Sequence, residues 1–319
     1  MRQPATPRLG YLVAVRIASL LPSATEIVCA LGARAQLVGR SHECDFPAGI
    51  DEVPVLTSAR IESSDSSRTI DAAVRNVLTE ALAIYRIDLD RLREARPDVI
   101  VTQDLCDVCA VSLTDVRAAV ARLAQQDVAI VSLRPMRLSH IWQDVLRVSA
   151  SIGRKEIGQE VVERLEDRVA AIARRAAAAE RRPRVVTIEW IAPVMIGGMW
   201  MPELVALAGG SPLVTVAGQH APTLDPARLA MLDPDVVVVK PCGFTLRRTL
   251  EEIDVLRDAL PRTWRARMYA ADGNAYFNRP GPRIVESLEI LAACVHPEEF
   301  PDLAEKHSAS FTRLAFDSE

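Results

Sequence analysis

The chain contains one sequence phrase twice, and this duplication limits its possible folds more than any other feature does. Residues 87–101 and 224–238 align at a constant offset of 137 residues, the difference between positions 88 and 225. The identical pairs in this alignment are Asp88/Asp225, Arg91/Arg228, Leu92/Leu229, Pro97/Pro234, Asp98/Asp235, Val99/Val236 and Val101/Val238. Each copy has the pattern of a short helix, a Pro-Asp turn and an apolar, β-branched run, which is typical of a strand buried on both faces of a parallel sheet. The duplication therefore predicts two related α/β lobes with mainly parallel sheets.

The segments directly after the two duplicated strands are the first candidates for a functional site. Residues 104–109 follow the first strand, and residues 240–243 follow the second. Ligands of parallel α/β sheets bind beyond the carboxyl ends of the strands. Two such edges that face each other would form a cleft between the lobes.

Hydrophobic periodicity extends the alternation of strands and helices over both halves of the chain. The segment from Pro22 to Glu26 predicts the start of a helix, with Ser23 as its N-cap and Glu26 completing a capping box. Further strands are expected at 13–20, 35–41, 128–133, 184–191 and 267–270. Further helices are expected at 69–85, 113–125, 138–153, 202–208, 246–260 and 284–294.

One predicted helix in the middle of the chain is much longer than the others. Residues 155–182 contain no Pro and place apolar side chains in one helical stripe at Ile157, Val161, Leu165, Val169 and Ile172. At 1.5 Å per residue, such a helix is roughly 40 Å long, about the width of a domain. A coiled-coil partner is the other interpretation, but the stripe covers too few heptads to favour it. We therefore expect an N-terminal lobe at 13–153, a connecting helix at 154–182 and a C-terminal lobe at 183–319, with limited hinge motion.

Composition and charge exclude several classes of protein. The chain of 319 residues has 49% hydrophobic and 25% charged side chains, which is enough for two domains with full cores. Its net charge of −4 comes from interspersed acidic and basic residues, so nucleic acid is not an expected partner. No segment approaches the ~20 apolar residues of a membrane-spanning helix, so the chain is not expected to be membrane-embedded. The apolar run at 11–15 is shorter than the ~7–15 residues of a signal-peptide core. We therefore expect no signal peptide and a cytoplasmic location. If the N-terminal segment does act as a signal peptide, the expected location is the periplasm.

A cluster of metal-competent side chains follows the second predicted strand. His42 and Cys44 lie two residues apart and can point to the same side of an extended segment, with Glu43 opposite. Cys106 and Cys109 follow the neighbouring strand and could complete a ligand set for zinc or another soft cation. A redox dithiol at Cys106 and Cys109 is a second interpretation. A structural role, in which the cysteines act as small hydrophobic residues, is a third.

The second half gathers aromatic side chains in predicted loops. The chain has only 4 Trp and 4 Tyr, and three of these residues, Trp190, Trp200 and Tyr276, fall in these loops. Aromatic residues bury about 150–250 Å² each and suit a large, flat ligand, although core packing is the alternative for each of them. Arg279 and Arg283 flank a Pro-Gly-Pro turn and either bind a carboxylate or phosphate or cap carbonyl groups. The chain contains neither a phosphate-binding Gly-rich loop nor the Gly-x-Ser-x-Gly motif of serine hydrolases.

Three segments resemble a known protein family. They are 17–27 (Ile-Ala-Ser-Leu-Leu-Pro-Ser-Ala-Thr-Glu-Ile), 38–45 (Val-Gly-Arg-Ser-His-Glu-Cys-Asp) and 102–112 (Thr-Gln-Asp-Leu-Cys-Asp-Val-Cys-Ala-Val-Ser). With the long helix, they are similar to the cobalamin-binding, class III substrate-binding proteins of ABC transporters, the helical-backbone metal receptors, over residues 16–295. The resemblance implies two α/β lobes joined by one long helix, with a cobalt corrinoid, haem or iron siderophore held between them. It also implies that Leu21, Pro22, Ser23, Trp190 and Trp200 line the cleft.

The sequence thus leads to one favoured function and one alternative. We expect a binding protein for a metal-containing ligand, with cobalamin or another corrinoid as the first choice. The residues expected at the site are Leu21, Pro22, Ser23, Glu43, Trp190, Trp200, Tyr276 and Arg279 for the ligand, and His42, Cys44, Cys106 and Cys109 for a metal. The alternative is a metal-dependent enzyme that uses zinc or iron on the same four side chains, with Glu43 or Asp45 as general base. An ABC transporter or a metal-receiving protein is the expected partner.

Overall fold

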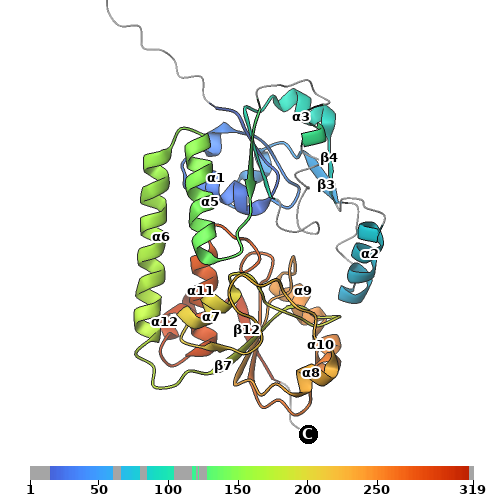
Figure 1. Cartoon of the computed structure of the whole chain (residues 1–319), viewed down its shortest axis with the longest axis vertical. Coiled ribbons are helices and arrows are strands. Elements are labelled where there is room, and N and C mark those ends of the chain that lie inside the picture. The colour runs from blue at the N-terminus through green and yellow to red at the C-terminus, as the bar shows by residue number, and fades with distance from the viewer. Residues whose placement is uncertain are drawn as a thin grey trace, which may run out of the picture.

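The computed structural model describes residues 15–59, 66–79, 85–103, 117–119, 121 and 128–315. Its two main sheets lie in two α/β lobes, one above the other in Figure 1, and helix α6 (Lys155–Ala176) runs along one side of both. This confirms the expected fold of two α/β lobes with mainly parallel sheets and one long helix. Residues 13–14 of the first expected strand and most of the helix expected at 113–125 lie outside the described residues.

The sheet of the first lobe is parallel throughout and has the strand order β2-β1-β5-β6. Its strands are β1 (Ile17–Ser19), β2 (Leu37–Arg40), β5 (Val99–Gln103) and β6 (Ala129–Leu133). β5 is buried along its whole length, as the apolar run at its start predicts. β3 (Thr57–Ala59) and β4 (Tyr85–Ile87) form a separate antiparallel pair. The other described elements of this lobe are α1 (Pro22–Ala30), η1 (Arg34–Gln36), η2 (Ile50–Glu52), α2 (Ser67–Thr79), α3 (Leu89–Ala95) and α5 (Leu138–Ser151).

The second sheet has the order β12-β11-β10-β7-β8, with β9 (Ser211–Pro212) beside β7. The central strands β7 (Arg184–Trp190), β10 (Val236–Val239) and β11 (Arg267–Ala271) are parallel. β8 (Met195–Ile196) and β12 (Phe311–Leu314) are antiparallel to their neighbours at the two edges. The helices of this lobe are α7 (Met201–Leu207), α8 (Pro226–Ala230), α9 (Leu246–Glu251), α10 (Ile253–Ala259), α11 (Ile284–Val295) and α12 (Pro301–Lys306).

Three expected helices differ in extent from the observed ones. The helix expected at 69–85 is described as far as Thr79, and Tyr85, its expected last residue, instead begins β4. The helix expected at 246–260 is interrupted at Glu252, where α9 ends and α10 begins. The long helix ends at Ala176 instead of 182, because no large apolar residue continues its buried stripe after Ile172.

The capping box expected at the start of α1 is wrong. The N-cap of α1 is Leu21, which makes no side-chain capping hydrogen bond, and Ser23 lies within the helix. Glu26 does not reach back to the helix start, because its carboxylate binds Arg283 of the second lobe. The Glu26 carboxylate, which the capping box would use, therefore forms a long-range ion pair instead.

The duplicated phrase has the same structural role in both lobes. Asp88 and Asp225 are the N-caps of α3 and α8, and their carboxylates accept hydrogen bonds from backbone N–H groups of the first turn. Asp98 accepts a hydrogen bond of 2.8 Å from the backbone N–H that precedes β1. Asp235 accepts one of 2.7 Å from the first backbone N–H of β7. The repeat thus aligns the beginnings of adjacent parallel strands and places their carboxyl ends at a common edge.

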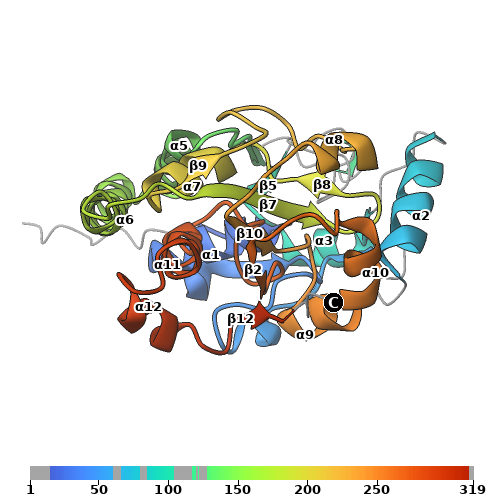
Figure 2. The ribbon, with the colours of Figure 1, turned by 90° about the horizontal axis from the view of Figure 1, so that it is seen from below.

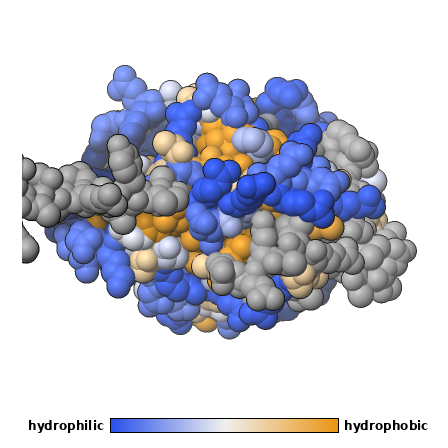
Figure 3. All heavy atoms as spheres, turned by 90° about the horizontal axis from the view of Figure 1, so that it is seen from above, coloured by the Kyte–Doolittle hydropathy of each residue, from blue (hydrophilic) through white to orange (hydrophobic). Residues whose placement is uncertain are grey.

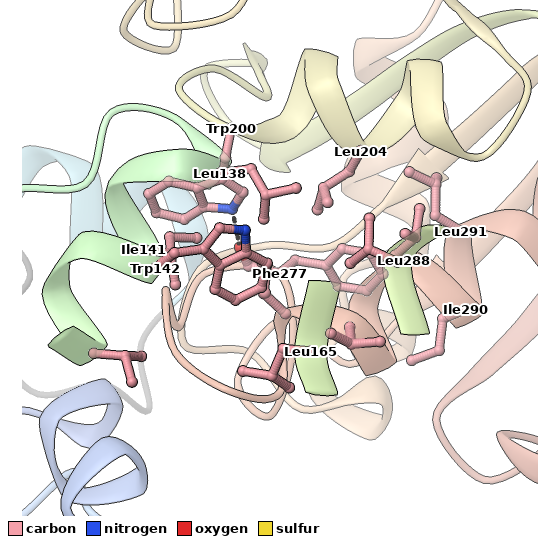
Figure 4. Packing of buried hydrophobic residues seen from close by; sticks show 14 of the residues in the cluster. Leu138, Ile141, Trp142, Leu165, Trp200, Leu204, Phe277, Leu288, Ile290 and Leu291 are labelled. Atoms are coloured by element: carbon pink, nitrogen blue, oxygen red, sulfur yellow. Dashed lines mark hydrogen bonds between the residues drawn. The ribbon is translucent and has the colours of Figure 1, made fainter. Parts of the chain in front are cut away.

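One hydrophobic core continues from the first lobe through α6 into the second lobe. Figure 4 shows Leu138, Ile141 and Trp142 of α5 close to Trp200 and Phe277 of the second lobe. Seen from below, α6, α7 and α11 lie towards one side of the molecule, and α2 and α10 lie at the other (Figure 2). Separation of the lobes would expose this core to water, so hydrophobic burial favours a fixed arrangement of the lobes.

Candidate functional site

The lobes meet where the carboxyl ends of their parallel strands face each other, and a buried ion pair joins them beside α1. Glu26 accepts hydrogen bonds of 3.0 and 2.6 Å from Nε and Nη2 of Arg283, and Arg279 lies 3.7 Å away. Glu26 is only 3% exposed. Burial raises the pKa of Glu26, and the neighbouring guanidinium groups of Arg283 and Arg279 only partly oppose this shift.

Asp45 forms a second bridge between the lobes. Its carboxylate accepts two hydrogen bonds from Arg279, that from Nη2 being 3.0 Å long, and another of 3.0 Å from Asn274. Burial opposes the ionisation of Asp45, but the hydrogen bonds and the charge of Arg279 outweigh it and lower its pKa. Tyr276 lies beneath the guanidinium of Arg283, which is 5.5 Å from the ring centroid. Arg279 and Tyr276, both expected at the ligand, are thus used in contacts at the lobe boundary.

The loop from Leu21 to Ser23 lies at the same boundary. Leu21 and Ser23 are each 2% exposed, and Pro22 is half-buried. A Cβ atom on Gly281 would lie only 3.3 Å from the backbone oxygen of Ser23, so glycine permits this close approach of the second lobe. Within the loop expected to line a cleft, Ser23 therefore packs against the Pro-Gly-Pro turn, and Leu21 belongs to the shared core.

His42 follows β2 and is held by the β3–β4 pair. Its ring Nδ1 lies 2.7 Å from Oγ1 of Thr57, and its ring packs edge-on against Tyr85 at a centroid distance of 5.0 Å. Its other nitrogen, Nε2, lies 3.5 Å from Oε1 of Glu43 and has no hydrogen-bond partner among the described residues. Burial lowers the pKa of His42, Glu43 opposes this shift and Arg40 adds to it.

Cys44 lies deeper in the first lobe than His42. It is 3% exposed, and its Sγ accepts a hydrogen bond of 3.0 Å from Oγ1 of Thr25. Burial raises the pKa of Cys44 to about 11, so the thiol keeps its proton at neutral pH. Cys106 and Cys109 lie outside the described residues, and within the described ranges no three His, Cys, Asp or Glu side chains are grouped as metal ligands.

The aromatic residues of the second lobe fall into two groups. Trp190 ends β7, is half-buried and packs edge-on against Phe244 at 5.3 Å. Its Nε1 is buried without a hydrogen-bond partner among the described residues. Trp200, in contrast, lies in the shared core and donates a hydrogen bond of 2.9 Å to the carbonyl oxygen of Phe277 (Figure 4). Trp190 thus lies at a carboxyl edge, whereas Trp200 is closed off by packing.

A fully buried lysine stands beside Trp190. Lys240 directly follows β10 and donates hydrogen bonds of 3.0 Å each to Glu189 and to the side-chain oxygen of Asn278. Its side chain has no solvent exposure. Because an unpaired buried ammonium group is costly, this pair fixes the ends of β7 and β10 relative to the turn that precedes Arg279.

Carboxylates of the second lobe also bind the N-termini of two helices of the first lobe. Glu203 accepts a hydrogen bond of 2.8 Å from the backbone N–H of Leu138, at the start of α5. Glu252 accepts two hydrogen bonds from Ser67, of 2.8 Å from its backbone N–H and 2.6 Å from its hydroxyl, at the start of α2. Negative charge at a helix N-terminus is favourable. These contacts hold the lobes together on the α6 side and on the opposite, α2 side.

The amino-terminal face of the first lobe offers a poorer site. Seen from above, it shows hydrophilic residues around apolar patches (Figure 3). A hollow near this end of the sheet is lined by Arg16, Arg93, Glu94 and Arg96. The guanidinium of Arg16 donates hydrogen bonds to the carbonyl oxygens of Ala95 and Arg96 and so caps the C-terminal end of α3. The carboxyl edges between the lobes remain the better candidate.

Several residues at this boundary were not identified from the sequence. Thr57 and Tyr85 lie in short strands without a clear periodic pattern, and Glu252 lies in what resembled one continuous helix. Lys240 was recognised only as part of a segment after a strand. Its position directly after four consecutive valines was the available signal, because a charged residue at the end of a buried strand needs a partner.

Solved structures share this fold over most of the chain. The periplasmic haem-binding protein RhuT from Roseiflexus sp. RS-1 is 20% identical with a TM-score of 0.65, covering 91% of this chain and 99% of its own. A possible iron-binding protein from Staphylococcus epidermidis ATCC 12228 is 18% identical with a TM-score of 0.65, covering 88% and 98%. The periplasmic vitamin B12 binding protein BtuF of Vibrio cholerae is 20% identical with a TM-score of 0.55, covering 88% and 96%.

Sequence comparisons agree with the fold. No curated protein matches the chain significantly. None of the helices in the described part of the chain has the length and apolar character needed to span a bilayer. The family model described as periplasmic binding protein matches residues 17–262, which is most of the chain. With its two α/β lobes and one connecting helix, this chain belongs to the periplasmic binding protein family and is a solute-binding protein of the class III type.

Proposed function

We propose that this chain binds a metal-containing ligand, with cobalamin or another corrinoid as the favoured choice, at the boundary between its lobes. One observation carries the proposal. His42 follows β2 and Trp190 ends β7, and each has a buried ring nitrogen without a hydrogen-bond partner among the described residues. Buried polar atoms are normally paired, so we take these two atoms at the carboxyl edges as the polar groups that a ligand would pair when it enters between the lobes.

The two nitrogens suit different parts of a corrinoid. The Trp190 Nε1–H can only donate a hydrogen bond, and the amide groups at the edge of a corrin ring offer acceptors. The ring of Trp190, supported edge-on by Phe244, offers an apolar surface for a flat macrocycle. His42 offers a nitrogen of the kind that cobalt and iron accept. Structures of similar fold that are described as haem-binding, vitamin B12-binding or iron-binding support this ligand class.

The proposal extends to a partner. One further structure of similar fold is described as an ABC transporter substrate-binding protein from Listeria monocytogenes EGD-e, with 16% identity and a TM-score of 0.61. A protein of this family that holds a ligand between two fixed lobes can hand it to a transporter of the ABC type. A metal-receiving protein is the alternative partner, and transfer of bound ligand to each would separate them.

Equilibrium titration of the purified chain with cobalamin, haemin and divalent metal ions tests the function. We expect corrinoid binding that quenches tryptophan fluorescence, raises the melting temperature and weakens about 30-fold in a Trp190→Ala variant, since loss of a central aromatic contact costs about 2 kcal/mol or more. Trp264→Ala is the matched control, because Trp264 is also half-buried but precedes β11 and lies at the amino end of the sheet. Absence of any spectral change or thermal shift with all three ligand types would refute the proposal.

A further inference from the structure

A ligand that binds between the lobes needs a way in, and the packing of the molecule limits where this is. On the α6 side, one apolar core runs through both lobes and includes Trp142 of α5 and Trp200 of the second lobe. Water does not replace apolar contacts of this kind, so hydrophobic burial keeps this side closed. On the opposite side, α2 lies at the level of the boundary between the lobes (Figure 1). The α2 side is therefore the side on which a small movement can give access.

Helix α2 crosses from one lobe to the other. Its 13 residues give it a length of roughly 20 Å. Its first residue, Ser67, donates two hydrogen bonds to Glu252 of the second lobe. After its last residue, Thr79, the next described residue is Tyr85, which begins β4 and packs against the ring of His42. α2 thus lies between the second lobe and the strand pair that holds His42.

The contact between Ser67 and Glu252 is buried and specific. Ser67 has no exposed surface, Glu252 is 5% exposed, and the two hydrogen bonds are 2.8 and 2.6 Å long. Glu252 lies at the break between α9 and α10, and its side chain makes no capping hydrogen bond to α10. It caps α2 instead, where a negative charge is favourable. The break in the helix expected at 246–260 thus places a carboxylate of the second lobe at the N-terminus of α2.

Glu252 keeps a partner when Ser67 moves away. Nη2 of Arg248 lies 3.4 Å from Oε1 of Glu252, on the preceding turn of the same helical segment. An unpaired buried carboxylate is costly, so Arg248 lowers the free energy of the state in which Ser67 has left. The contact between α2 and the second lobe can therefore break and form again.

Arg248 also connects this contact to a candidate ligand residue. Its guanidinium lies over the ring of Phe244, 5.1 Å from the ring centroid. Phe244 in turn packs edge-on against Trp190 at a centroid distance of 5.3 Å. The anchor of α2 and Trp190 thus belong to one continuous group of side chains that begins at the carboxyl edge of the second lobe.

We propose that α2 is a strap that closes the lobe boundary on the side opposite α6, and that the hydrogen bonds from Ser67 to Glu252 are its latch. With the latch made, α2 restricts entry to the edge that carries Trp190. When Ser67 leaves Glu252, α2 moves aside and the lobes keep their arrangement. The ligand in this inference rests on the proposed function, but the opening of α2 can be measured without a ligand.

Hydrogen–deuterium exchange of the ligand-free protein tests the latch. Glu252→Ala should speed the amide exchange of residues 67–79 about tenfold, the factor for losing one hydrogen bond to a charged group, and leave α6 unchanged. Glu251→Ala is the matched control, because Glu251 is 43% exposed and binds arginines of its own helix. Glu203→Ala is a second control that removes a similar hydrogen bond on the α6 side. Neither control should change the exchange of residues 67–79.

Two milder variants keep the test valid if Glu252→Ala folds poorly. Glu252→Gln retains an acceptor oxygen for Ser67 and should give a smaller increase in exchange than Glu252→Ala. Ser67→Ala removes the hydroxyl bond alone and leaves the side chains of the second lobe intact, so it should also increase exchange. Circular dichroism shows whether each variant is folded.

Acrylamide quenching of tryptophan fluorescence tests whether α2 covers the ligand edge. The measurement uses a Trp264→Phe background, because Trp142 and Trp200 are only 7% and 6% exposed and Trp190 then dominates the quenching. Glu252→Ala should raise the quenching constant of Trp190, and the two controls should not.

Stopped-flow mixing with cyanocobalamin and with haemin measures access for the ligand. For a ligand that binds, Glu252→Ala should raise the association and dissociation rate constants by a similar factor, about tenfold, because a strap that controls access affects both directions. The dissociation constant should change much less.

The outcomes separate this inference from the proposed function. If residues 67–79 exchange at the wild-type rate in Glu252→Ala, the latch is refuted. If they exchange faster but the quenching of Trp190 or the rate constants stay unchanged, α2 does not control access and the strap is refuted. If neither cyanocobalamin nor haemin binds to the wild-type protein, the proposed function fails, and exchange and quenching still decide whether α2 is a strap.

Discussion

Glu289 of α11 stabilises the fold by an amount that can be calculated from its surroundings. Its carboxylate accepts hydrogen bonds of 2.8 Å from Arg168 on α6 and 2.6 Å from Lys306 on α12, and lies 2.7 Å from Nε2 of His307. Burial opposes its ionisation, but these hydrogen bonds outweigh burial and lower the pKa of Glu289 from 4.5 to about 2. At 1.36 kcal/mol per pKa unit, the change corresponds to about 3 kcal/mol in favour of the charged form.

The sign of the pH dependence follows from the direction of this shift. Because the pKa is lower in the folded state than in the unfolded state, the stabilisation is present above a pH of about 4.5 and is lost as the pH falls towards 2. Glu289→Gln replaces the carboxylate with a neutral group of the same shape. It should lower the free energy of unfolding by about 3 kcal/mol at pH 7 and by about half as much at pH 3.

Urea denaturation of the wild type and Glu289→Gln between pH 3 and 7 measures this difference. Glu286→Gln is the matched control, because Glu286 also accepts a hydrogen bond from Arg168, of 3.0 Å, but is 24% exposed. Its loss should stay below about 1 kcal/mol, as for other ion pairs near solvent. A loss for Glu289→Gln that is independent of pH, or no larger than that of Glu286→Gln, would show that the buried carboxylate is not the source of the stabilisation.

Three further predictions concern the ion pairs and hydrogen bonds that hold the lobes and their strands in place. Arg283→Ala should lower the free energy of unfolding by about 3 kcal/mol, because it leaves the buried carboxylate of Glu26 without its main partner; a loss below 1 kcal/mol in urea denaturation would contradict this. Glu189→Ala should lower the melting temperature more than Lys240→Met does, since only the former leaves a fully buried ammonium group without a counter-charge, with the neutral Asn278 side chain as its remaining acceptor, and the opposite order would refute the argument. Asp98→Ala should cost about 1 kcal/mol through the hydrogen bond that aligns β1 and β5; an unchanged urea midpoint would exclude this role.

Parts of the fold could be predicted because they depend on local pattern. The strands observed as β6, β7 and β11 and the helices observed as α5, α7 and α11 lie within two residues of their expected limits. Each has a period or an apolar run that belongs to its own segment. The short strands β8, β9 and β12 were not expected, since two to four residues carry too little pattern to identify an edge strand.

Less of the candidate site than of the fold could be predicted from local sequence pattern. His42, Glu43 and Trp190 could be selected from residue type and from their position after strands. Arg279 and Tyr276 were also selected by residue type, yet Arg279 pairs with Asp45 of the first lobe and Tyr276 packs against Arg283 of its own lobe. Residue type does not reveal whether a charged or aromatic side chain has a partner far away in the chain.

The sequence by itself determined the two-lobed parallel architecture, because the duplicated phrase specifies a capped helix, a turn and a doubly buried strand through contacts within its own lobe and its adjacent strand. Only the tertiary structure decided which side chains at the carboxyl edges are available to a ligand. Glu26 and Asp45 are used by arginines more than 200 residues away, and Trp200 is enclosed by the shared core. The contact of His42 Nδ1 with Thr57 depends on the pairing of β3 with β4, which a long segment of the chain separates from each other. Availability depends on long-range neighbours, and these exist only once the lobes have packed.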